Sequence, residues 1–180
     1  SPALASKAIS LSLVAVDSPE VGANLQDHPG SAMAFELDRR WAFEEELRFD
    51  RAVRSFIRWR LRGTGIMGAP PLAISANIAS QPGNPQVDLH FLLVPLAMET
   101  KLWFPGLKPR YGPRLSAMWA LNYPASRGHL ALASADPAAH PRICFNLLSA
   151  PEDRAAMIHG YHVLRALVRQ PSLAALTGAM

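Results

Sequence analysis

The feature that most constrains the fold is an alternating stretch, QVDLHFLLVPL, at residues 86–96. Apolar side chains stand at every second position from Val87 to Leu93, and Asp88 and His90 stand between them. Because successive side chains of a β-strand point to opposite faces, this pattern predicts a strand with one buried face. We therefore expect a sheet with one face packed against other elements of the chain.

The other predicted elements do not alternate strictly between strand and helix. They are strands in LSLVAV (11–16), LSAMWALNYP (115–124) and GHLALAS (128–134), and helices over residues 44–61 and 151–169. This order argues against a parallel sheet with crossover helices and favours the α+β class. We expect an antiparallel β-sheet with helices packed on one face.

The predicted helix at residues 44–61 carries one broad apolar face and many arginines. Its apolar residues recur every three or four positions, so they share one side of the helix; they are Leu47, Phe49, Val53, Phe56, Ile57 and Leu61. Arginines between positions 48 and 62 supply much of the net charge of +4. We interpret them as a solvated helix face and expect no nucleic-acid partner, because the remainder of the chain is close to neutral.

The chain is long enough to fold around its own core. It has 180 residues, 49% hydrophobic and 18% charged, and a chain of this size needs no disulfide or metal for stability. Its single cysteine, Cys144, excludes an internal disulfide, and apolar neighbours predict that it is buried. The longest apolar runs are too short to span a bilayer, and no signal peptide stands at the front, so a cytoplasmic location is expected.

Few residues offer catalytic chemistry by their pattern alone. His159 and His162 lie three apart in a predicted helix without a third ligand, so no metal site is expected. Asp88 and His90 share a strand face, where either the carboxylate orients a general base or His90 is a satisfied core residue. The chain has no G-x-S-x-G, G-x-G-x-x-G or Walker sequence. The residues alone therefore predict a soluble α+β domain without a complete catalytic constellation.

The polar segment VGANLQDHP, residues 21–29, is the least ordinary part of the sequence. It contains Gly, Asn, Gln, Asp, His and Pro within nine positions. Such a segment is either an ordered polar loop or backbone shaped to lie against a ligand.

Several stretches resemble segments of the glucose-methanol-choline (GMC) oxidoreductases. VGANLQDHP resembles the segment that follows the flavin-binding portion of that family, and PQVDLHF is similar to its central sheet strand. Residues 124–171 resemble its C-terminal segment, in which Pro-x-Ser-Arg-Gly opens a strand and an acidic cap precedes a helix. The matching residues there are Pro124, Ser126, Arg127, Gly128, Ser134, Asp136, Pro137, Pro141, Ile143, Asn146 and Asp153.

The resemblance implies the substrate-binding portion of an FAD-dependent enzyme. Such an enzyme oxidises an alcohol to an aldehyde or ketone by hydride transfer to the flavin. Residues 1–30 would form a flavin-side connecting segment, and residues 31–180 would form the substrate-binding α+β domain, whose sheet roofs the active site.

The resemblance also implies roles for particular residues. The residues close to the flavin would be Asn24, Gln26, Asp27 and His28. Trp103 and Phe104 would line or gate the substrate entrance, unless they only pin a surface loop. Arg127 is expected to anchor its turn rather than to touch the substrate.

Parts of the family pattern are absent from the sequence. The glycine fingerprint of the FAD-binding domain is missing, and the catalytic His is expected beyond Met180, so the sequence resembles a fragment that is inactive alone. Its partners would be the missing FAD-binding domain and a small alcohol. The alternative is a non-catalytic module that binds a ligand or a partner without flavin.

The sequence also favours one class of alcohol. Leu92, Val94, Leu96 and Trp103 would supply an apolar lining, which favours an aliphatic or aromatic alcohol over a polyol. No acidic residue is placed to meet a quaternary ammonium group, which disfavours choline.

Overall fold

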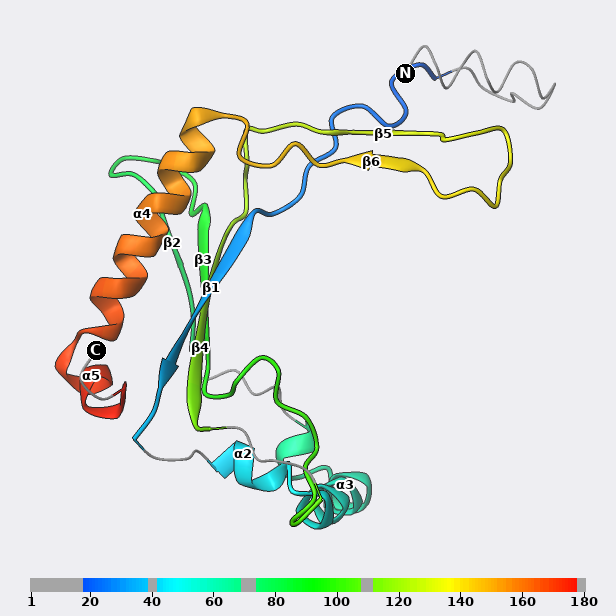
Figure 1. Cartoon of the computed structure of the whole chain (residues 1–180). Helices are drawn as coiled ribbons and strands as arrows, with labels where there is room; N and C mark the ends of the chain where they lie inside the picture. Colours follow the sequence, from blue (N-terminus) through cyan, green and yellow to red (C-terminus); the bar gives the residue numbers. More distant parts are fainter. Residues whose placement is uncertain (1–17, 39–41, 69–73, 108–111, 178–180) are drawn as a thin grey trace. The chain divides into compact units, whose positions relative to one another are not determined.

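The computed structural model describes residues 18–38, 42–68, 74–107 and 112–177 (Figure 1). The strand expected at residues 11–16 lies outside these ranges. The chain divides into two compact units. The first consists of Ser1–Pro29 and Leu121–Met157, and the second of Gly30–Ala120 and Ile158–Met180.

The second unit is built on a four-stranded sheet. Its strands follow the order β1-β4-β3-β2, with bounds Gly30–Glu36 for β1, Arg114–Leu121 for β4, Leu89–Val94 for β3 and Ile74–Ile78 for β2. β1 pairs antiparallel with β4, and β2 pairs antiparallel with β3. The predicted antiparallel sheet is confirmed; β3 lies within the stretch expected to form a strand at residues 86–96, and β4 overlaps the stretch expected at residues 115–124.

One face of this sheet forms the core. Leu89, Phe91 and Leu93 of β3 are almost completely buried, as their alternation predicts. Ala117 and Trp119 of β4 are buried as well. Full burial of a Leu or Phe side chain contributes roughly 1.5–3 kcal/mol, so this face supplies much of the stability of the unit.

The second half of the helix α4, Pro151–Val168, packs on the core face of the sheet. In its second half, Leu164 and Val168 are completely buried, and the ring of Tyr161 lies 6.2 Å from that of Trp119. A Cβ at Gly160 would stand 2.7 Å from Cδ1 of Trp119, so the glycine permits the close approach of helix and strand. The expected helix on one face is therefore present. A second short helix, α5, spans Pro171–Thr177.

The basic helix predicted at residues 44–61 is divided into α2, Ala42–Glu46, and α3, Phe49–Arg62. α3 ends at Gly63, whose φ of 66° is a left-handed conformation that glycine adopts without strain. A 3-10 helix, η1, follows at Ile66–Gly68. The side of α3 that is buried carries Ala52 and Ser55. The large apolar side chains of the predicted face that lie on α3 are exposed, whereas Leu47, which precedes α3, is half-buried. In the described ranges, no helix is both long and apolar enough to cross a membrane.

A two-stranded hairpin belongs to the first unit. It consists of β5, His129–Ala131, and β6, Arg142–Cys144, which pair antiparallel. All three residues of β6 are exposed. The expected burial of Cys144 is therefore wrong, because its apolar neighbours Ile143 and Phe145 are themselves exposed.

Candidate functional site

An apolar recess lies on the face of the four-stranded sheet that α4 does not cover. Its volume is about 470 Å³, and its lining is Gly30, Ser31, Ala32, His90, Leu92, Met118, Trp119 and Ala120. All of these residues belong to the second unit. The recess is therefore a feature of one compact unit.

The pairing of the strands explains this lining. Leu89 and Trp119 both approach Gly160 of α4, so their alternate neighbours point to the opposite face. Register pairs Gly30 with Ala120 and Ala32 with Met118. Glycine and alanine on β1 and β4 leave room between the larger side chains, and this room is the recess.

His90 is the one titratable residue in the lining of the recess. Its Nε2 lies 3.1 Å from the hydroxyl of Ser75 on the neighbouring strand β2. Ser75 pairs with Leu92, so both hydrogen-bonded side chains project from the uncovered face. A polar pair at the edge of an apolar recess can orient one polar group of a bound molecule.

The carboxylate of Asp88 does not orient His90. Asp88 is buried and accepts hydrogen bonds from the backbone N–H and the hydroxyl of Ser80, both at 2.6 Å, and from Nδ2 of Asn84 at 3.1 Å. It thereby fixes the turn that leads into β3. Of the two interpretations of this pair, the oriented general base is not supported by the geometry.

The segment that contains Asn24, Gln26, Asp27 and His28 is exposed and held in an extended form. Leu25 exchanges two backbone hydrogen bonds with Gly128, at 3.0 and 2.8 Å. Nε2 of Gln26 donates to the carbonyl of Pro124, and Oδ1 of Asp27 accepts from the backbone N–H of His28. Asn24 has a φ of 56°, which turns the backbone sharply at this point. The segment is thus tied to residues 124–128 by the backbone of Leu25 and by the side-chain amide of Gln26.

Asp153 anchors the turn on which this segment rests. Its two carboxylate oxygens accept hydrogen bonds from the backbone N–H groups of Ala125 and Ser126, each at 2.8 Å. Burial acts to raise the pKa of Asp153, but these hydrogen bonds and the charge of Arg127 together hold it below its usual value. The sequence indicated Asp153 only as an acidic cap at the start of α4, and its bond to a turn 27 residues away was missed.

Arg127 has the structural role that was expected of it. Its guanidinium donates to the carbonyls of Pro124 and Ser126, at 2.6 and 3.0 Å. Asn146 donates from Nδ2 to the carbonyl of Arg127. The turn is therefore closed by its own side chains.

Trp103 and Phe104 lie beside the beginning of α3. The backbone of Trp103 exchanges hydrogen bonds with Leu47 and Phe49, and the ring of Phe104 stacks on that of Phe49 at 4.7 Å. Neither residue belongs to the lining of the recess. Their role at a substrate entrance stays a prediction.

Of the apolar residues that the sequence suggested as substrate lining, Leu92 is in the recess, whereas Val94 and Leu96 are not. Gly30, Ala32, Met118 and Ala120 were not foreseen. The sequence signal that could have identified these four residues is their alternation with core residues along each strand. Using that signal to predict the recess would have required the register between the strands. Among the described residues, no group of His, Cys, Asp and Glu could hold a metal ion, and this includes His159 and His162.

Sequence comparisons connect these segments with known enzymes. A family model described as GMC oxidoreductase matches residues 124–179. An oxygen-dependent choline dehydrogenase of Paraburkholderia xenovorans (strain LB400) is 28% identical over 161 residues, which cover 87% of this chain and 27% of that protein. The corresponding protein of Paraburkholderia phytofirmans is 29% identical with the same coverage.

Solved structures share the fold. A formate oxidase superimposes with a TM-score of 0.74 at 19% identity, over 91% of this chain and 33% of that chain. An FAD-dependent oxidoreductase from Chaetomium thermophilum gives a TM-score of 0.67 at 16% identity, over 89% and 33%. Identities this low concern the fold alone.

Together, these matches confirm the resemblance to a C-terminal portion of the GMC oxidoreductases, whose family model matches residues 124–179. The chain spans 27% of the length of the choline dehydrogenases that it matches.

Proposed function

We propose that this chain is the substrate-side portion of an FAD-dependent oxidoreductase that oxidises an alcohol to an aldehyde or ketone. The observation that carries the proposal is the recess on the uncovered face of the sheet. It is apolar, has room for a small molecule, and borders one polar pair, His90 and Ser75. It occurs in a fold shared with GMC oxidoreductases.

The lining favours an uncharged alcohol with an aliphatic or aromatic body. Leu92 and Met118 offer apolar contact, and no carboxylate is among the eight lining residues. A quaternary ammonium ion such as choline is usually held by an opposite charge or by aromatic rings. The aromatic residue of the lining, Trp119, turns its ring toward Gly160 of α4 and away from the recess. The choline dehydrogenases are therefore relatives in fold and sequence, while the proposed substrate is different.

The polar segment fits a position beside a flavin. The edge of the isoalloxazine ring carries carbonyl oxygens and ring nitrogens, which require hydrogen-bond donors and acceptors. Asn24, Asp27 and His28 expose such groups, and Gln26 ties the same segment to Pro124. Bound FAD would accept the hydride from the alcohol carbon.

The residues of this chain would bind and orient the alcohol. Apolar side chains on the uncovered face would exclude water from the reacting carbon, and His90 would give the hydroxyl group its direction. No role as the base that accepts the hydroxyl proton is proposed for these residues, and the chain alone is proposed to be inactive.

Filling the recess tests this proposal. In the flavin-loaded natural protein that contains this sequence, Ala32→Phe would occupy space that the alcohol requires. We expect KM for the preferred alcohol to rise about tenfold or more, with an unchanged flavin spectrum. The matched control is Ala34→Phe, on the same strand and the same face but outside the recess. Equal KM values for both variants would contradict the assignment.

A further inference from the structure

The helix α3 presents its large apolar side chains to the outside. The exposed side chains recur every three or four positions and so form a stripe along one side of the helix. We call this set the apolar stripe; with their exposed fractions, its members are Phe49 45%, Val53 42%, Phe56 51%, Ile57 50% and Leu61 76%. A stripe of this kind on a surface helix normally faces a partner.

The opposite side of α3 holds the helix in this orientation. Ala52 and Ser55 are buried at 4% and 2% exposure. A Cβ at Gly68 would stand 2.9 Å from Trp59, so η1 lies against the same side. The backbone N–H of Phe49 is bonded to the carbonyl of Trp103 at 3.0 Å. The small residues therefore pack inward, and the apolar stripe is directed outward by the fold itself.

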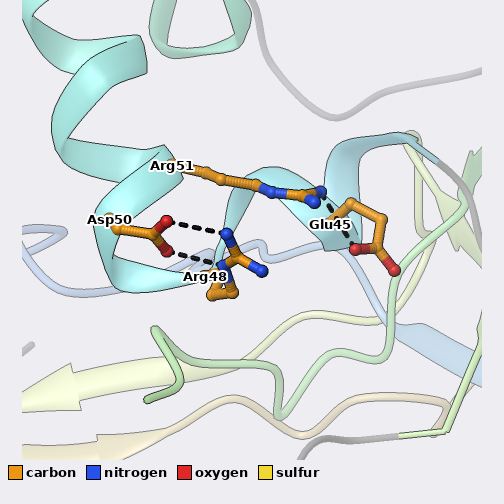
Figure 2. A network of polar contacts seen from close by, with 4 residues as sticks. All are labelled: Glu45, Arg48, Asp50 and Arg51. Carbon is orange, nitrogen blue, oxygen red and sulfur yellow. Dashed lines mark hydrogen bonds and ion pairs between the residues drawn. The ribbon is translucent and has the colours of Figure 1, made fainter. Parts of the chain in front are cut away.

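Several arginines belong to α3 or directly precede it. Figure 2 shows that Arg48 is paired with Asp50, at 2.6 and 2.7 Å, and that Arg51 is paired with Glu45 at 3.0 Å. Arg54, one turn away from Arg51, has no ion pair among the described residues.

A recess of about 280 Å³ lies along this arginine side. Its lining consists of Glu46, Arg48, Arg51, Arg54 and Arg58. With more basic than acidic groups around it, the recess suits a phosphate group, which guanidinium groups bind in a forked geometry.

The charges distinguish between possible partners of the apolar stripe. Arg60 is exposed and lies one turn from Phe56 and Ile57, within the stripe. The centre of a protein–protein interface is depleted of charge, and a nucleic acid offers no apolar phase for five such side chains. A bilayer surface with anionic headgroups offers both, because arginine can extend to the phosphates while apolar side chains enter the acyl region.

We propose that α3 binds the surface of an anionic lipid bilayer. The helix lies in the plane of the interface, with the apolar stripe among the acyl chains. Arg60, within the stripe, and Arg54, beside it, extend to lipid phosphates. It does not span the bilayer. The inference does not depend on alcohol oxidation, because it concerns a different face of the second unit.

Vesicle flotation tests the proposal on the flavin-loaded natural protein that contains this sequence. The probes are vesicles of phosphatidylcholine alone and vesicles of phosphatidylcholine mixed with phosphatidylglycerol. We expect the protein to float with the mixed vesicles, to float less with the neutral ones, and to be released by added salt. Alcohol turnover is measured in a separate assay, so that a loss of vesicle binding can be distinguished from a loss of enzyme activity.

Two pairs of variants locate the binding surface. Ile57→Asp should lower the partition coefficient on mixed vesicles about tenfold or more. The control Ile158→Asp, at an isoleucine of α4 that is 60% exposed, should leave this coefficient unchanged. Arg54→Glu should lower it about tenfold, whereas the same change at the exposed Arg169 of the other helical region should have little effect.

Several results would overturn the proposal. One is the absence of flotation with mixed vesicles by folded, flavin-containing protein. Another is flotation that all four variants retain equally. If Ile57→Asp instead dissociates an oligomer, or lowers the melting temperature without any vesicle binding by the parent, the apolar stripe is a protein interface and the proposal fails.

Discussion

At the scale of single residues, Asp153 shows how one carboxylate can fix a turn far away in the sequence. It is 2% exposed and accepts the backbone N–H groups of Ala125 and Ser126. Both oxygens are occupied, so removal of the carboxylate leaves two donors without their acceptor. The hydroxyl of Ser126 accepts from the backbone N–H of Ala150, which closes the connection to the start of α4.

We predict that Asp153→Asn lowers the free energy of unfolding by about 1–3 kcal/mol at neutral pH. The pKa of Asp153 is lowered in the folded protein. The stabilisation is therefore complete above the unfolded pKa of about 3.9 and is lost as the pH falls through the folded pKa. Urea unfolding at neutral and acid pH measures both effects, and the difference between variant and parent should shrink in acid.

The control for this prediction is Glu152→Gln, at the neighbouring exposed carboxylate in the first turn of α4. It removes a similar charge but no hydrogen bond to the turn. An Asp153→Asn protein as stable as its parent at neutral pH would refute the anchoring role.

At the scale of elements, Gly128 joins the polar segment to the hairpin. It exchanges two hydrogen bonds with Leu25 on one side. On its other side, a Cβ would stand 2.0 Å from the carbonyl oxygen of Cys144 and 2.6 Å from that of Phe145. These are backbone atoms and cannot rotate away, so only glycine fits between the two segments.

Gly128→Ala is accordingly expected to destabilise the protein by about 3 kcal/mol, in the upper range for overpacking. Thermal unfolding measures the loss. Gly112→Ala is the matched control, because a Cβ there meets no atom within 4 Å. Similar melting temperatures for the two variants would mean that the segments can separate without cost.

The elements also show what the sequence could predict. Residues 86–96 predicted β3 and its buried side correctly, because alternation depends only on local geometry. β1, with the sequence GSAMAFE, was missed: its Gly30, Ala32 and Ala34 have little strand preference, and its pairing with β4 supplies the order. The recess therefore could not be predicted, since β1 provides part of its lining.

The predicted helix face shows a second reason for failure. Periodicity identified Phe49, Val53 and Leu61 as neighbours on one side of α3, and this grouping is correct. It could not indicate which side packs inward, because that side is set by the following segment, in which Gly65 lies against Ser55 and Gly68 lies against Trp59. Periodicity thus predicts which residues share a face, and tertiary packing determines what covers it.

At the scale of the whole molecule, the chain divides into two compact units, and each carries candidate features of its own. The first contains the polar segment and the Asp153 turn, and the second contains the sheet and its recess. The choline dehydrogenases that this chain matches are about four times longer than the matched stretch, which covers 27% of their length. The alcohol oxidation proposed above is therefore a proposal about a longer protein, in which the residues of this chain would supply binding surfaces.

The most direct test of the central claim is an absorbance spectrum of the natural protein that contains this sequence, recorded without oxygen before and after addition of an apolar primary alcohol. We predict the visible bands of oxidised flavin, which the alcohol bleaches because its hydride reduces the cofactor. The same spectrum of the 180-residue chain, mixed with FAD and desalted, should show no retained flavin. A colourless natural protein, or a flavin that no alcohol reduces, would contradict the account.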